Sequence, residues 1–233
     1  MATLYLIPTP LAPDTAAQVL SPPIAEAVAR LDYFFVEELR TARRFISGLR
    51  TGRVIDETTF YDLHKDTPEA DTKRQLLDLL AQNQDAGVLS EAGCPGVADP
   101  GAVAVRLAHE LGFRVEPLVG PSSILLALMA SGMSGQSFVF HGYLPINRAD
   151  RSRMVKQLET EARNRRQTQI FMETPYRNNG MLADLLATAL PDTRLCIATN
   201  VTAPDALIQT KTIRQWKSSL PDLHKKPTIF LLY

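Results

Sequence analysis

The segment Leu89–Gly101, LSEAGCPGVADPG, decides the fold of this chain and points to a site. It holds three glycines and two prolines in thirteen residues, between a strand-like run and a helix-like run. Glycine lets the backbone approach a ligand closely or adopt positive φ, and proline stiffens a loop. In α/β proteins, binding sites form at such strand-to-helix turns. Ordinary turns share this composition, so the loop by itself names no ligand.

The residues around this loop alternate between strand patterns and helix patterns. Helices of ten to fifteen residues between short apolar strands are typical of a parallel sheet. The expected strands cover 3–10, 32–38, 85–93 and 114–120. The expected helices cover 39–49, 70–84, 101–113 and 121–132, together with 15–31, where Pro22 and Pro23 interrupt the helical pattern.

The sharpest change in composition follows a short strand at 137–145, where a polar, Arg-rich segment covers 146–167. It predicts a domain boundary near Pro145. The fold class is α/β with two α/β domains. An N-terminal, mostly parallel domain over 1–145 carries the Gly/Pro-rich loop, and a smaller, mixed one covers 146–233. In the second, we expect strands at 168–175, 194–200 and 228–233 and a helix at 176–190.

The composition excludes several classes of protein. Lys plus Arg and Asp plus Glu both number 25, which does not support a strongly basic nucleic-acid binder but leaves a local patch open. Two cysteines are too few for a disulfide framework, no His/Cys cluster has zinc spacing, and no metal is expected. The N-terminus lacks a signal-peptide pattern, and the longest apolar run, Ile124–Ala130, is well short of a membrane span. We expect a soluble, cytoplasmic protein.

Several turns carry residues with chemical potential, each with an ordinary alternative. Glu37 and Glu38 end a strand, where one faces a crevice or both are simply solvated. His64 is a candidate general base, although a lone loop histidine usually is not one. Cys94 is a reactive thiol or a small residue filling a turn.

The Arg run from Arg148 to Arg166 either grips phosphates or forms a solvated helix face. Glu159 and Glu161 partly neutralise it. The chain has neither a G-x-G-x-x-G turn after its first strand nor a P-loop, so dinucleotide binding and P-loop hydrolysis are unsupported. The residues alone define an α/β protein with a ligand crevice.

The ordered motifs TLYLIPTPLA, FFVEELR, LSEAGCPGVADPG, VEPLVGPSSILLALMASGM, FVFHGYLP and IFMETPYR resemble those of the tetrapyrrole methylase superfamily. The chain is most similar to the branch of small-subunit ribosomal RNA 2′-O-ribose methyltransferases. The resemblance implies a two-domain enzyme, usually a homodimer, that binds S-adenosylmethionine between its domains. It implies cofactor contacts at Pro8, Pro10, Gly93, Cys94, Pro95, Val97, Ser122, Ser123, Met172, Ala198 and Thr228.

The chain also departs from this branch. The TPIGN turn is replaced by Thr9–Pro13, and EDTR is replaced by Glu37–Arg40. The segments that correspond to LHDHN and ARELTK are Leu63–Thr67 and Ala198–Ala203, and a C-terminal extension is expected to be missing after Tyr233. The cofactor turns are thus better preserved than the positions presumed to face RNA.

Methyl transfer to a ribose hydroxyl needs alignment and a base that helps remove the proton. The catalytic candidates are Glu37 as first choice for the base, His64 as second, and Arg40 to position a phosphate. The leading hypothesis is an S-adenosylmethionine-dependent methyltransferase acting on ribosomal RNA or the small ribosomal subunit. The alternatives are methylation of a tetrapyrrole or other small molecule, and a catalytically silent module that binds cofactor or RNA.

Overall fold

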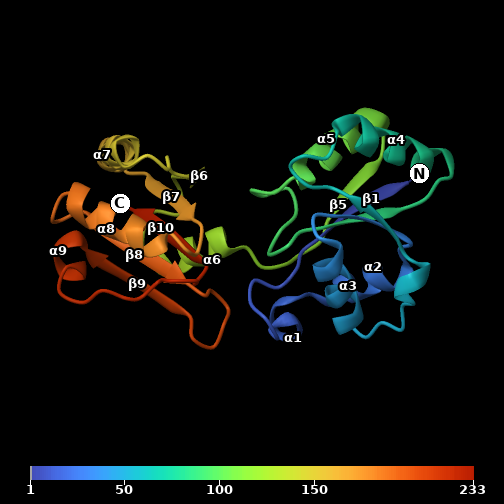
Figure 1. The fold of residues 1–233 in the computed structure, drawn as a ribbon, viewed down its shortest axis with the longest axis horizontal. Coiled ribbons are helices and arrows are strands. Elements are labelled where there is room, and N and C mark those ends of the chain that lie inside the picture. Colours follow the sequence, from blue (N-terminus) through green and yellow to red (C-terminus); the bar gives the residue numbers. More distant parts are fainter. Residues whose placement is uncertain (1) are drawn as a thin grey trace. The chain divides into compact units, whose positions relative to one another are not determined.

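The computed structural model describes residues 2–233, which form two compact units (Figure 1). Unit 1 covers Met1–Ser122 and unit 2 covers Ser123–Tyr233. Each unit has its own five-stranded sheet and its own hydrophobic core. Within residues 2–233, no helix is both long and apolar enough to cross a bilayer.

Unit 1 is built on a fully parallel sheet with the strand order β3-β2-β4-β1-β5. The central strands are continuous apolar runs, as expected for strands covered on both faces. The strands are β1 (Thr3–Ile7), β2 (Tyr33–Val36), β3 (Thr59–Asp62), β4 (Ala86–Leu89) and β5 (Arg114–Pro117).

Helices cover both faces of this sheet (Figure 1). Leu76 and Leu107, from α4 and α5, pack in one core cluster, and Ile24 and Ile46, from α2 and α3, pack in another. The helical elements are α1 (Ala16–Val19), α2 (Pro22–Arg30), α3 (Leu39–Gly48), η1 (Ile55–Glu57), α4 (Glu69–Ala81) and α5 (Gly101–Leu111). This layering leaves the carboxyl ends of the parallel strands as one common edge.

The expected elements of unit 1 are confirmed. The helical run over 15–31 is interrupted as expected, because Pro22 begins a new helix at its first turn. Strand β3 was not expected, since its four residues, TFYD, are half-buried or exposed and carry no strong alternation.

Unit 2 has a mixed sheet with the order β6-β7-β10-β8-β9. Only β6 and β7 are parallel, and the remaining neighbours are antiparallel. The strands are β6 (Phe138–Tyr143), β7 (Thr168–Glu173), β8 (Arg194–Thr199), β9 (Leu207–Thr212) and β10 (Thr228–Leu232). The edge strand β9 was not expected from the sequence.

The main core of unit 2 lies between this sheet and three helices, α7 (Arg148–Arg165), α8 (Asn178–Thr188) and α9 (Ile213–Trp216). Phe171 and Phe230 stack there on neighbouring strands, with ring centroids 5.7 Å apart. Trp216 is fully buried in the same cluster and donates its indole N–H to the Leu195 carbonyl at 2.8 Å. The helix α6 (Ser123–Ser131) packs against β9 and β10.

The division between units differs from the predicted boundary near Pro145. Residues 123–145 contain α6 and β6, and β6 is hydrogen-bonded to β7 in the sheet of unit 2. The Arg-rich segment that suggested the boundary is the exposed helix α7 within that unit. The change in composition therefore marks a solvated helix instead of a domain junction.

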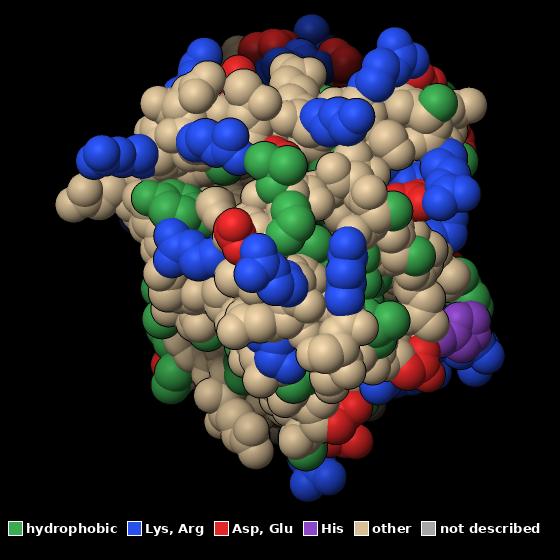
Figure 2. Space-filling view, turned by 90° about the vertical axis from the view of Figure 1, so that its left-hand side faces the viewer, with side chains coloured by type: hydrophobic (Ala, Val, Ile, Leu, Met, Phe, Trp, Pro, Cys, Tyr) green, Lys and Arg blue, Asp and Glu red, His purple; other side chains and the backbone are tan. Residues whose placement is uncertain are grey.

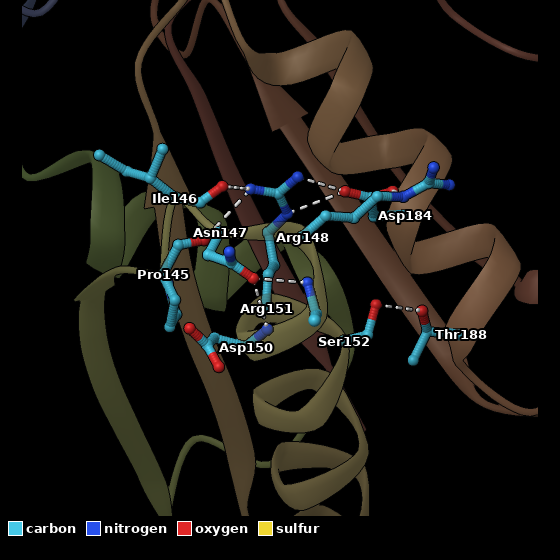
Figure 3. Close-up of polar contacts among 10 residues, drawn as sticks. Pro145, Ile146, Asn147, Arg148, Asp150, Arg151, Ser152, Asp184 and Thr188 are labelled. Atoms are coloured by element: carbon cyan, nitrogen blue, oxygen red, sulfur yellow. Dashed lines mark hydrogen bonds and ion pairs between the residues drawn. The ribbon is translucent and has the colours of Figure 1, made fainter.

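The chain that enters α7 is fixed by a buried carboxylate (Figure 3). Asp184 of α8 accepts hydrogen bonds from Nε of Arg148 at 2.8 Å and Nε of Arg151 at 2.9 Å. Arg151 also donates from Nη1 to the carbonyls of Pro145 at 3.1 Å and Ile146 at 2.8 Å. The guanidinium of Arg151, at the start of α7, thus joins the turn at Pro145 and Ile146 to helix α8.

Candidate functional site

The turns that follow β1 and β4 are joined at the carboxyl edge of the unit 1 sheet. Thr9 and Gly93 exchange two backbone hydrogen bonds, with N···O distances of 3.0 and 3.1 Å. The Thr9 hydroxyl donates to the Ser90 carbonyl at 3.1 Å, and the Ser90 hydroxyl donates to the Gly93 carbonyl at 3.1 Å. The edge is therefore a fixed backbone platform, where ligands of parallel sheets gather.

Sequence reasoning missed Thr9 and Ser90 as parts of this platform. Both side chains are buried. A hydroxyl residue within two positions of the end of a buried strand is the signal that was available, because a buried hydroxyl needs a hydrogen-bond partner.

Two glycines lie where the turns approach one another, and an added side chain would be tight at Gly93 and would clash at Gly120. Gly93 has φ +80°, and an added Cβ would lie 3.1 Å from Leu11 Cδ2 and 3.3 Å from the Pro121 carbonyl oxygen. At Gly120, an added Cβ would lie 2.2 Å from Cβ of Pro8. Pro8 and Gly93, both predicted site positions, are thus packed against the turn that follows β5.

The rest of the Leu89–Gly101 loop is held by Asp99. Its Oδ1 accepts from the backbone N–H of Gly96 at 2.6 Å and of Gly101 at 2.9 Å, which fixes the loop to the start of α5. Burial raises the pKa of the Asp99 carboxyl, these two hydrogen bonds oppose the rise, and the charge of Glu37 adds to it. Of the predicted loop positions, Pro95 is buried and Val97 is exposed.

Cys94 is half-buried in this loop, and its Sγ lies 3.4 Å from the Pro121 carbonyl oxygen, to which it donates. Burial raises the pKa of the Cys94 thiol, and the charge of Asp99 raises it further. A raised pKa keeps the thiol protonated, and the thiolate is the nucleophilic form. The geometry favours a packing or contact role for Cys94.

The predicted catalytic candidates lie at the same edge of unit 1. Glu37 directly follows β2, and His64 follows its neighbour β3; both side chains are exposed. Glu38 caps α3 by accepting from the backbone N–H of Arg40 at 3.1 Å, so the strand-end carboxylate with a structural task is Glu38. Within residues 2–233, no hydrogen bond or ion pair joins Glu37 to His64.

A hollow of about 310 Å³ opens beside these turns within unit 1. The turn after β1 forms one wall, and α3 forms another. Glu91, which sequence reasoning did not select, also lines it. Burial raises the pKa of the Glu91 carboxyl, Thr41 opposes this through a hydrogen bond, and the charges of Glu37 and Glu38 raise it further. Its lining includes Thr9, Pro10, Leu11, Thr41, Arg44, Phe45, Ser90 and Glu91.

The two predicted serines straddle the division of the chain, because unit 1 ends at Ser122 and α6 begins at Ser123. The three predicted positions of unit 2 lie on adjacent strands of its sheet. Met172 and Ala198 both pair with Ile229, and Thr228 precedes that residue on β10. The structure groups these three positions, and their role in binding stays a prediction.

Comparison with known proteins places the chain in a family. Residues 12–216 match the family of Tetrapyrrole (Corrin/Porphyrin) Methylases. The chain belongs to this family, whose members are S-adenosylmethionine-dependent methyltransferases.

Curated relatives carry a more specific name. The chain is 34% identical over 206 residues to a ribosomal RNA small subunit methyltransferase I of Micromonospora olivasterospora, covering 87% of this chain and 60% of that protein. It is 29% identical over 232 residues to the protein of the same name from Haemophilus influenzae, covering 98% and 77%. The chain thus spans between three fifths and four fifths of the length of these two relatives.

Solved structures share the fold over the whole chain. The methyltransferase CobJ matches with a TM-score of 0.65 at 18% identity, covering 100% of this chain and 94% of that one. A uroporphyrin-III C-methyl transferase from Thermus thermophilus, complexed with S-adenyl homocysteine, matches with a TM-score of 0.58 at 14% identity, covering 99% and 97%. At these identities the likeness defines the α/β fold alone.

Proposed function

We propose that this chain uses S-adenosylmethionine to methylate a ribose 2′-hydroxyl of small-subunit ribosomal RNA. The observation that carries the proposal is the carboxyl edge of unit 1, where Gly93 and Gly120 leave backbone in place of side chains. The names of the curated relatives support the acceptor, and membership of the family supports the cofactor.

The residues at the edge fit this cofactor. A wall of backbone N–H and C=O groups recognises a polar ligand without long side chains, and both glycines are positions that a Cβ would fill. The turn at Pro8 and Pro10, together with the loop from Gly93 to Val97, would hold the cofactor. When bound, S-adenosylmethionine supplies a sulfonium methyl group to the acceptor. Met172, Ala198 and Thr228 are proposed as further contacts from unit 2.

The chain's own side chains would orient the acceptor and take its proton. Glu37 is the proposed base, because its exposed carboxylate lies at the edge that carries the cofactor loop and its charge reaches Asp99. His64, on the adjacent strand end, is the second candidate. Arg40 is exposed in the first turn of α3 and is proposed to hold an RNA phosphate.

A substitution at Glu37 tests the base. We expect Glu37→Gln to lower kcat by about 100-fold or more while affinity for S-adenosylhomocysteine is retained, since general-base catalysis is worth about 10²–10⁴-fold. Glu26→Gln, an exposed acid on α2, is the matched control. If His64→Gln lowers kcat and Glu37→Gln does not, His64 is the base and Glu37 is not.

The acceptor is tested with purified protein and methyl-tritiated cofactor. We expect label in ribosomal RNA of small subunits from a strain that lacks the gene, recovered as an alkali-resistant dinucleotide. Porphyrinoid precursors serve as the competing acceptor, because family members with solved structures include uroporphyrin-III methyltransferases. Label in the porphyrinoid supports the small-molecule alternative, and cofactor binding without labelling of either supports the silent module.

The family resemblance also motivates a proposed homodimer. Sedimentation equilibrium is expected to give about twice the monomer mass of 25.8 kDa. A single species at the monomer mass across a wide concentration range would contradict it.

A further inference from the structure

The zero net charge of the chain hides an uneven division between its units. Unit 1 has 11 Lys and Arg against 17 Asp and Glu, and unit 2 has 14 against 8. The formal charges are therefore −6 and +6. A polyanion is attracted by a local potential and not by the total charge of the chain, so unit 2 is the half that would attract one.

Several exposed cations of unit 2 lie along α7 and α9 or directly after these helices. Figure 2 shows the side that carries α7 and α9, where Lys and Arg side chains spread across the surface and acidic side chains lie mostly toward its margins. We give the name basic face to six exposed cations on or directly after α7 and α9, which are Arg153, Lys156, Arg163, Arg166, Arg214 and Lys217.

Along α7 these residues recur at helical spacing. Arg153, Lys156 and Arg163 are exposed and lie three and seven residues apart, so they share one side of the helix. The exposed neutral side chains between them, Gln157 and Thr160, are hydrogen-bonding groups. The Thr160 hydroxyl donates to the Lys156 carbonyl at 2.8 Å, so Gln157 is the neutral donor beside these cations. A row of cations with a neutral donor matches the oxygens of a phosphodiester backbone.

Of the three acids of α7, Asp150 pairs with Arg153 at the start of this row, and the other two leave the rest of the row unpaired. Glu159 is buried and faces inward, where it accepts hydrogen bonds from the backbone N–H of Leu190 at 2.8 Å and from the Thr193 hydroxyl. Glu161 pairs with Arg165 at 2.6 Å. Within residues 2–233, no acidic side chain forms an ion pair with Lys156, Arg163 or Arg166.

A hollow of about 480 Å³ lies at the C-terminal end of α7 and extends this row. Arg163, Arg166 and Tyr233 line it, and the guanidinium of Arg194 lies over the Tyr233 ring at 4.6 Å from its centroid. Asp192 on its wall pairs with Arg214 at 3.0 Å. Exposed guanidinium groups beside an aromatic ring are a combination that RNA-binding surfaces use for phosphates and unstacked bases.

We propose that the basic face binds the phosphate backbone of the RNA acceptor, which rests on the proposed function. Four of its six cations are arginines, whose planar forks suit phosphate oxygens. An anionic membrane is the competing partner. Membrane-surface helices bury an apolar stripe in the bilayer, whereas the apolar residues of α7, such as Val155 and Leu158, are buried in the core of unit 2.

The test measures binding of a fluorescein-labelled RNA hairpin to the full chain by anisotropy over a series of salt concentrations. The triple variant Lys156→Gln, Arg163→Gln, Arg166→Gln removes three cations from the basic face. The matched control, Arg74→Gln, Arg106→Gln, Arg114→Gln, removes three exposed cations from unit 1. Both variants change the total charge equally.

We expect the triple variant to bind the hairpin roughly 10- to 100-fold more weakly at about 100 mM salt, with a log–log salt slope smaller by about 2. The control is expected to stay within about twofold of the unchanged protein. S-adenosylhomocysteine affinity, measured by calorimetry, should be the same in all three proteins, which shows that both variants are folded.

Four results would each overturn the proposal. RNA affinity could fall equally in the two variants, or it could stay unchanged in the Lys156, Arg163, Arg166 variant. The unchanged protein could fail to bind the hairpin, or it could bind anionic vesicles more tightly than RNA. The proposed function fails separately. If the protein binds RNA through this face but methylates none, the interface stands and the methyl acceptor is wrong. If it methylates RNA and the triple variant binds as well as the unchanged protein, the activity stands and the interface is wrong.

Discussion

The carboxyl edge of unit 1 and the basic face of unit 2 present polar groups in different ways. At the edge, the contacts come from backbone: Thr9 and Gly93 exchange hydrogen bonds, and glycines at 93 and 120 remove side chains. On the basic face, the polar groups are the ends of long, exposed side chains on α7 and α9. The backbone groups of the edge are held in place by the fold, whereas the long side chains of the basic face can change rotamer to fit a ligand.

This difference suits ligands of different size. A small cofactor is recognised best by preorganised groups that lose little entropy on binding, and a long phosphate backbone is held by several mobile charges. The two surfaces should therefore respond differently to mutation. Changes at the edge should alter folding and cofactor affinity together, whereas changes on the basic face should alter RNA affinity alone.

The largest effect is expected at Asp184, which joins α8 to the start of α7 in unit 2. Asp184→Ala leaves the guanidinium of Arg151 buried without its partner, and removing one member of a buried pair costs about 3–5 kcal/mol of unfolding free energy. Urea denaturation followed by the fluorescence of Trp216, in the core of unit 2, measures it.

Asp192→Ala is the control for Asp184→Ala, because its ion pair with Arg214 is exposed and such pairs contribute about 1 kcal/mol or less. Similar costs for the two substitutions would show that the Asp184 cluster does not hold unit 2 together.

Gly120→Ala should have the next largest effect and should act on unit 1. The new Cβ would lie 2.2 Å from Cβ of Pro8, so the turns after β1 and β5 must move apart. Overpacking of this kind costs about 1–3 kcal/mol, and S-adenosylhomocysteine affinity should fall with it.

Gly135→Ala in unit 2, where an added Cβ meets nothing within 4 Å, controls for the loss of glycine. If Gly120→Ala kept both the stability and the affinity of the unchanged protein, the edge would be adaptable after all.

The smallest effect concerns the pH dependence of unit 1. Burial raises the pKa of Asp99 in the folded state, so between the unfolded and folded pKa values the native state binds more protons. The free energy of unfolding should therefore fall as pH rises through this acidic window.

Asp99→Asn should flatten this fall, because its amide oxygen still accepts from Gly96 and Gly101 but carries no charge. The raised pKa of Glu91 acts in the same direction in both proteins and cancels in the comparison. Parallel stability–pH curves, measured by urea denaturation across the acidic range, would refute this role of burial.

The sequence was sufficient for much of unit 1. Strong apolar runs and turn formers predicted β1, β2 and β4 and the loop from Leu89 to Gly101, because buried parallel strands need little context. The edge strands β3, β5 and β9 are only partly buried. Of these, β5 was predicted between two glycine-containing turns, and β3 and β9 were missed.

Other features depend on tertiary neighbours. The need for glycine at 120 exists only because Pro8 packs against it, and the inward direction of Glu159 follows from its contacts with Leu190 and Thr193. The uneven charge of the units was readable in the sequence, but only once the division after Ser122 replaced the one expected near Pro145.

The central claim is that the backbone edge of unit 1 holds S-adenosylmethionine, and titration calorimetry with S-adenosylhomocysteine tests it most directly. Gly93→Ala places a Cβ at φ +80°, 3.1 Å from Leu11 Cδ2. Gly112→Ala introduces the same left-handed strain, at φ +86°, with nothing within 4 Å. We expect binding to the unchanged protein, near-equal binding to Gly112→Ala, and at least about tenfold weaker binding to Gly93→Ala, which corresponds to 1.4 kcal/mol. Equal affinities for the two variants, or no heat of binding in the unchanged protein, would contradict the account.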